Sequence, residues 1–250
     1  MDKLAFVALA SVKEQAKIRA SITNSLANAT TVGFKESFEA ATSAIKVEGS
    51  GYSRYTPALV LQDRVKLKPG SLIQTDRALD IAMRRSTVLG IQAQDGTIGF
   101  TRRGDLTIAP SGLIENMAGQ VVMGEGGPIS APDGMILKIT PDGTVVAQAP
   151  AGGEAESIEI AQLMLRDASQ ITLARREDGL FEPVDARGED FATGPEPVGV
   201  QSGSLEGSNV SVVDTMVKLM DFSRQFEMQI KMIKEIQGID KSGSSMMKSQ

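Results

Sequence analysis

The chain has 250 residues, a formal net charge of −5 and 41% hydrophobic residues, so it can bury a real core in one or two domains. The acidic balance makes nucleic acid a poor main partner, and no apolar run approaches the roughly 20 residues that span a bilayer. The sequence contains no Cys and no His, which excludes thiolate metal sites and removes the commonest general base. We therefore expect no enzyme, no cofactor and no metal site.

Residues 1–29 are predicted to form the N-terminal amphipathic helix. Apolar side chains recur there at the three- and four-residue spacing of one helix face, and polar side chains gather on the other. One alternative is that this face packs only on its own domain, and the other is that it binds other helices. The residues predicted to make those contacts are Leu4, Leu9, Val12, Ile18, Ile22 and Leu26.

The middle of the chain is predicted to be β-rich. Residues 30–69 contain Gly, Ser and Pro where a long helix would need other residues, and we predict an extended connector there. In residues 70–197, Asp-Gly pairs begin at Asp95, Asp133, Asp142 and Asp178, and such pairs favour hairpin turns because both residues tolerate positive φ. We expect a Greek-key or barrel-like domain with irregular loops, followed by a linker at 198–208.

Residues 209–250 are predicted to form the C-terminal helix and a tail. Ser211 and Asp214 have the spacing of a capping box, and Gly238 is expected to end the helix. The seven-residue steps from Leu219 to Phe226 to Ile233 are those of a left-handed supercoil. The residues predicted to contact other helices are Val212, Met216, Leu219, Phe226, Ile230 and Ile233.

These segments together predict an α+β fold. The N- and C-terminal amphipathic helices are expected to pair as a coiled-coil-like layer, and the central domain is expected to be irregular and β-rich. Such a plan suits a protein whose two ends bind many neighbouring chains.

A motif follows the first helix, Asn24-Ser-Leu-Ala-Asn28-Ala-Thr-Thr31-Val-Gly33-Phe34-Lys35. Asn28 can end the helix in the left-handed conformation or by bonding free carbonyls, and Gly33 permits a sharp turn. This turn is expected to lie outside the β-domain core. The motif resembles the signature of flagellar rod and hook proteins, Asn-Leu-Ala-Asn followed by Thr-x-Gly-aromatic-basic, with Ser25 where the family usually has Asn. The predicted signature turn comprises Asn24, Asn28, Thr31, Gly33, Phe34 and Lys35.

The resemblance continues along nearly the whole chain. Segments 69–82, 95–104 and 204–210 are similar to the family's entry into its β-domain, to its Asp-Gly-x-x-x-aromatic-Thr-Arg-x-Gly stretch, and to the residues before its C-terminal helix. Thr87 and Val88 stand where the family commonly has Gly and an aromatic residue.

The resemblance implies a structural subunit of the bacterial flagellar basal-body rod. Such subunits polymerise with themselves and with other rod subunits into the axial drive shaft, in the periplasmic part of the rod. The resemblance also implies transport by the flagellar export apparatus. In agreement, charged residues follow the apolar patch 4–10 where a cleavage site would need small ones, so we expect no cleaved signal peptide.

Two alternatives stay open. Segments 223–233 and 126–129 are more similar to the proximal-rod (F-type) branch of the family than to the distal-rod (G-type) branch, which is the first alternative. The second is a protein that binds membrane surfaces through its N-terminal helix. That helix has an Ala-dominated apolar face and a small basic excess, so helix–helix assembly explains it better.

Overall fold

The computed structural model describes residues 2–49, 52–149 and 157–248, and its description covers only the backbone at 2–14, 38–63, 236 and 239–248. The chain divides into two compact units. One unit comprises Met1–Ala27 and Ser211–Gln250, and the other is Asn28–Val210.

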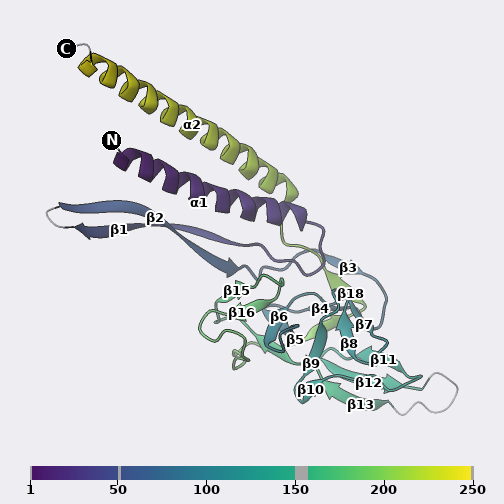
Figure 1. Cartoon of the computed structure of the whole chain (residues 1–250). Coiled ribbons are helices and arrows are strands. Elements are labelled where there is room, and N and C mark those ends of the chain that lie inside the picture. The colour runs from purple at the N-terminus through teal and green to yellow at the C-terminus, as the bar shows by residue number, and fades with distance from the viewer. Residues whose placement is uncertain (1, 50–51, 150–156, 249–250) are drawn as a thin grey trace. The chain divides into compact units, whose positions relative to one another are not determined.

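The first unit is helical and contains α1 (Asp2–Ala27) and α2 (Val212–Lys248) (Figure 1). Ser211 caps α2 as predicted, because its Oγ accepts a hydrogen bond from the Asp214 N–H at 3.3 Å. The prediction that Gly238 ends this helix is wrong, since α2 continues to Lys248. A single helical Gly costs only about 1 kcal/mol, and the sequence after it contains no Pro.

The predicted coiled-coil-like layer of paired terminal helices is also wrong. A coiled coil buries the residues of its seam, but Val212 and Met216, two members of the predicted ridge, are 39% and 49% exposed. A recess of about 540 Å³, lined by Ala16, Ala20, Phe222 and Phe226 among others, remains where interlocked side chains would leave no space. Strands, not a helical layer, dominate the described fold.

The second unit contains all eighteen strands of the described residues. They are β1 (Ser37–Gly49), β2 (Tyr52–Val65), β3 (Leu72–Gln74), β4 (Ile81–Met83), β5 (Thr87–Gln92), β6 (Ile98–Thr101), β7 (Leu106–Ile108), β8 (Ile114–Asn116), β9 (Val121–Gly124), β10 (Gly127–Pro128), β11 (Ile136–Ile139), β12 (Thr144–Gln148), β13 (Ile158–Gln162), β14 (Leu165–Asp167), β15 (Leu173–Arg175), β16 (Phe181–Pro183), β17 (Val200–Ser202) and β18 (Ser204–Glu206).

These strands form one large sheet and three small ones. The large sheet runs in the order β1-β2-β15-β16-β6-β5-β9-β8-β7, with β10 paired to β9 and β14 to β5. The small sheets are β11-β12-β13, β17-β4 and β18-β3. The stretch predicted as an extended connector therefore contains the first two strands of the large sheet, and the stretch predicted as a linker contains β17 and β18.

Turns form at the Asp-Gly pairs of this unit, as the sequence predicts. The glycines of all four predicted Asp-Gly turns, Gly96, Gly134, Gly143 and Gly179, have positive φ. The turns at Asp95, Asp142 and Asp178 join paired antiparallel strands, whereas Asp133-Gly134 lies between β10, which pairs with β9, and β11, which pairs with β12. The apolar side chains of the strands meet in two buried clusters. The larger cluster includes Ile81, Leu89, Leu106 and Val145, and the smaller one centres on Phe100 and Phe191, whose rings lie 4.6 Å apart.

Candidate functional site

The residues predicted to contact other helices differ in exposure. Leu4, Leu9 and Val12 lie in residues 2–14 of α1, of which only the backbone is described. The half-buried ones are Ile18, Ile22, Leu26, Leu219, Phe226, Ile230 and Ile233. Nothing in a single chain tests whether they bind other subunits, so this interface stays a prediction.

The signature turn begins directly after α1. Asn24 lies in the last turns of that helix with an exposed side chain, and Asn28 follows its last residue. The backbone carbonyl of Asn28 accepts from the Thr31 N–H at 3.1 Å, and its Oδ1 accepts from the Thr31 hydroxyl at 3.1 Å. Asn28 itself does not take the left-handed conformation, so a tight turn closed by Thr31 follows the helix.

Gly33 is the residue at which this turn enters the β-rich unit. Its φ is +69°, its N–H donates to the Glu206 carbonyl at 2.7 Å, and it is buried. A Cβ at this position would lie 2.5 Å from the backbone of Arg102 and Arg103. The expectation that this turn lies outside the β-domain core is therefore wrong, and only Gly fits both its φ and its close approach to the backbone.

Phe34 packs within its own unit. The Arg175 guanidinium lies over its ring, 4.1 Å from the centroid, in the geometry of a cation–π contact. Arg175 also donates from Nη2 to the Lys35 carbonyl. The aromatic residue of the signature thus holds the turn against β15.

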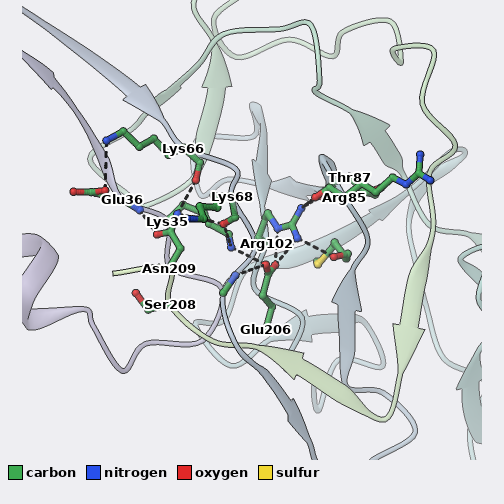
Figure 2. A network of polar contacts seen from close by, with 12 residues as sticks. Lys35, Glu36, Lys66, Lys68, Arg85, Thr87, Arg102, Glu206, Ser208 and Asn209 are labelled. Carbon is green, nitrogen blue, oxygen red and sulfur yellow. Dashed lines mark hydrogen bonds and ion pairs between the residues drawn. The ribbon is translucent and has the colours of Figure 1, made fainter. Parts of the chain in front are cut away.

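Lys35 ends the signature in a buried ion cluster with Arg102 and Glu206 (Figure 2). The Lys35 and Arg102 side chains are fully buried, and that of Glu206 is 1% exposed. Lys35 Nζ donates to Glu206 Oε1 at 2.7 Å, and Arg102 Nε donates to Glu206 Oε2 at 2.6 Å. We call these three residues the ion cluster.

Backbone groups complete the ion cluster. The second partner of Lys35 Nζ is the Lys68 carbonyl at 3.1 Å, and Glu206 Oε1 also accepts from the Gly70 N–H at 3.0 Å. The Arg102 guanidinium donates to three further carbonyls, those of Met83, Arg85 and Thr87, at 2.8, 2.5 and 2.9 Å. The Thr87-Val88 departure from the family pattern thus lies at the start of β5, where the Thr87 carbonyl supports Arg102.

The electrostatics of the ion cluster are unbalanced, because two cations share one carboxylate. Burial disfavours the charged form and lowers the pKa of Lys35, although Glu206 partly opposes that effect. Burial likewise lowers the pKa of Arg102. Removing the carboxylate of such a cluster would leave two uncompensated buried cations, which is strongly destabilising.

Asn209 adds a second set of links beside the ion cluster. Its Oδ1 accepts from the Glu36 N–H at 2.6 Å, and its Nδ2 donates to the carbonyls of Lys66 and Lys68 at 2.9 and 3.3 Å. The Asn209 N–H donates to the Phe34 carbonyl at 3.3 Å. The segment that enters the β-rich unit and the segment that leaves it are therefore bonded side by side.

Sequence reasoning placed Arg102, Glu206 and Asn209 inside family-like segments but did not predict that they meet. The only available signal is at Glu206, an ionisable residue that lies between Leu205 and Gly207. Composition could not show the burial, because Lys and Glu are almost always exposed unless they are paired.

The polar groups of the ion cluster bind one another and the backbone, which leaves few of them to bind a substrate. Both Glu206 oxygens accept from donors of the chain itself, and the cations point to carbonyls. In the part of the chain that the structure describes, no three His, Cys, Asp or Glu side chains gather as a metal site. Over the same residues, neither helix has the length and apolar character needed to cross a membrane.

Comparison with known proteins gives consistent matches. Residues 201–246 match the family model described as flagellar basal body rod FlgEFG protein C-terminal. The flagellar basal-body rod protein FlgF of Salmonella typhimurium is 34% identical over 240 residues, which cover 94% of each chain. FlgF of Escherichia coli is 32% identical with the same coverage. FlgG of Buchnera aphidicola from Schizaphis graminum is 27% identical over 231 residues, covering 85% of this chain and 87% of that protein.

Proposed function

Since the chain belongs to the flagellar basal-body rod protein family, we propose that it is a structural subunit of the proximal rod. The observation that carries this proposal is the 34% identity to Salmonella FlgF across 94% of both chains. Relatives named FlgG match at lower identity over a smaller part of the chain, so a distal-rod subunit is the less supported alternative.

The mechanism we propose is mechanical. Half-buried and exposed apolar residues of the helical unit bind the same unit of neighbouring subunits, and the β-rich unit makes further contacts. The exposed apolar side chains of α2 support this, because large apolar side chains are rarely left open in such number on one helix. They are Val212, Val213, Met216, Val217, Met220, Met228 and Met232. Contacts that do not close on themselves generate an open helical arrangement, as a rod requires.

The finer features of the function are part of the proposal. We place the subunit in the periplasmic part of the basal body, together with other rod subunits. We also propose that it leaves the cell through the flagellar export apparatus without a cleaved signal peptide. A chain without Cys can cross an oxidising compartment unfolded without forming disulfides.

The test is deletion of the gene in the bacterium that encodes it, followed by complementation. We expect the deletion strain to stop swimming and to lack complete rods, and the wild-type gene to restore both. Normal swimming by the deletion strain would overturn the proposal. Co-sedimentation of the purified chain with liposomes separately tests the membrane-surface alternative, for which we expect no binding.

A further inference from the structure

We propose that Lys35, within the ion cluster, is a positioning residue. It holds together the two segments by which the chain enters and leaves the β-rich unit, which we call the crossings. The crossings are residues 33–36, which enter the unit, and residues 206–209, which leave it. The proposal rests on the proposed function, because fixed crossings are useful in a shaft that transmits torque.

The geometry shows why one side chain can control both crossings. Lys35 belongs to the entering segment, and its Nζ reaches Glu206, the first residue of the leaving segment, at 2.7 Å. The same nitrogen binds the Lys68 carbonyl at 3.1 Å, just before Gly70, whose N–H binds the same Glu206 oxygen. The ammonium group thus joins three chain segments that lie far apart in the sequence (Figure 2).

Further links between the crossings include main-chain bonds and bonds of Asn209. They are Gly33 N–H to the Glu206 carbonyl, Asn209 N–H to the Phe34 carbonyl, and Glu36 N–H to Asn209 Oδ1. These bonds set the direction of each segment. In contrast to them, the Lys35–Glu206 bond is charge-assisted and fully buried, and such bonds are roughly twice as strong as neutral ones. This bond therefore holds the two crossings together.

The charge balance lets positioning be separated from general stability. Replacing Glu206 would leave two buried cations without a carboxylate, so Glu206→Gln is expected to fold poorly. Lys35→Met instead leaves Arg102 and Glu206 as a balanced pair, and Met has a similar unbranched shape. We therefore expect Lys35→Met to keep the β-rich unit folded while it removes the ionic link between the crossings.

The experiment is amide hydrogen exchange on the full-length purified chain. In Lys35→Met, we expect the Gly33 and Asn209 amides to exchange at least about tenfold faster than in the wild type. The Gly90 amide, which donates to the Met164 carbonyl at 2.8 Å inside the body, should keep its rate. Lys66→Met is the matched control. The Lys66 side chain is 52% exposed, and its Nζ lies 3.5 Å from Glu36 Oε2, which is a long distance for an ion pair. This variant should change the exchange rate of none of these amides.

Swimming of cells that carry each variant is the second measurement. We expect reduced swimming for Lys35→Met and normal swimming for Lys66→Met. Wild-type exchange at Gly33 and Asn209 in Lys35→Met would overturn the proposal, and so would equal acceleration at Gly90, since Lys35 would then only stabilise the whole unit. If the wild-type gene fails to restore swimming to the deletion strain, the proposed function fails, whereas the exchange data still decide the positioning role.

Discussion

At the scale of single residues, two features of the backbone require glycine at position 33. It combines positive φ with a backbone approach that leaves no room for Cβ. We expect Gly33→Ala to lower the free energy of unfolding by about 2 kcal/mol or more, because backbone strain and overpacking each cost about 1–3 kcal/mol. Urea unfolding of the purified chain measures this.

Gly96→Ala is the control for Gly33→Ala. Gly96 also has positive φ, +82°, but open space surrounds the position of its missing Cβ. It should therefore show only the conformational cost of about 1 kcal/mol. Equal losses for the two variants would show that the backbone of Arg102 and Arg103 does not restrict position 33.

Asp95 provides a residue-scale test of the turns. Its pKa is lowered mainly by the Thr97 hydroxyl, which donates to Oδ1 at 2.5 Å, and further by the Thr97 N–H and by Arg176. A carboxylate with a depressed pKa adds stability above its ordinary pKa and loses it as the pH falls through the depressed value. Thr97→Val removes the hydroxyl, so the Asp95 pKa should rise in an NMR titration, and Thr97→Ser should keep it low. An unchanged pKa in Thr97→Val would contradict this assignment.

At the scale of secondary-structure elements, the sequence predicted those features that depend on residues next to each other in the chain. All four Asp-Gly pairs predicted to form turns have a glycine with positive φ, a preference that resides in the two residues themselves. The ion cluster was not predictable in the same way, since Lys35 and Glu206 are 171 positions apart. No sequence period links them, and only the pairing of β18 with β3 and the turn at Gly33 bring them together.

The hairpin of β1 and β2 was predicted only as extended chain. Its two strands pair from Ser37↔Val65 to Gly49↔Tyr52, yet within the described residues β2 meets another strand only at Arg64↔Ala174. A two-stranded ribbon alone is marginally stable in water. Figure 1 shows this ribbon projecting from the rest of its unit.

We therefore expect the hairpin to need neighbouring subunits. In the purified monomer, amides of the outer ladder from Glu39 to Gly49 should exchange far faster than those of β5 and β6. In isolated rods the same amides should be protected. Equal protection in both states would show that the hairpin is stable without a partner.

At the scale of the whole molecule, the apolar residues of the helical unit are expected to act only in the assembly. Ile230→Asp should abolish swimming, because a buried, unpaired carboxylate costs several kcal/mol at each interface and the polymer repeats that cost in every copy. The melting temperature of the β-rich unit should stay unchanged. Gln225→Asp, at an exposed position of the same helix, is the control and should swim normally.

The family could be predicted from the sequence because its motifs are contiguous, whereas the arrangement of the helices could not. The heptad steps at Leu219, Phe226 and Ile233 suit a seam with any partner, and a single sequence does not say which helix provides it. That ambiguity explains why pairing within one chain was expected, whereas Val212 and Met216 are exposed in the structure.

The most direct test of the central claim is a structure of rods isolated from the bacterium that encodes the chain. We predict that this chain occupies the proximal rod, with its α2 apolar side chains buried against neighbouring subunits. Complete rods that lack the chain, or rods in which those α2 side chains remain exposed to solvent, would contradict the account.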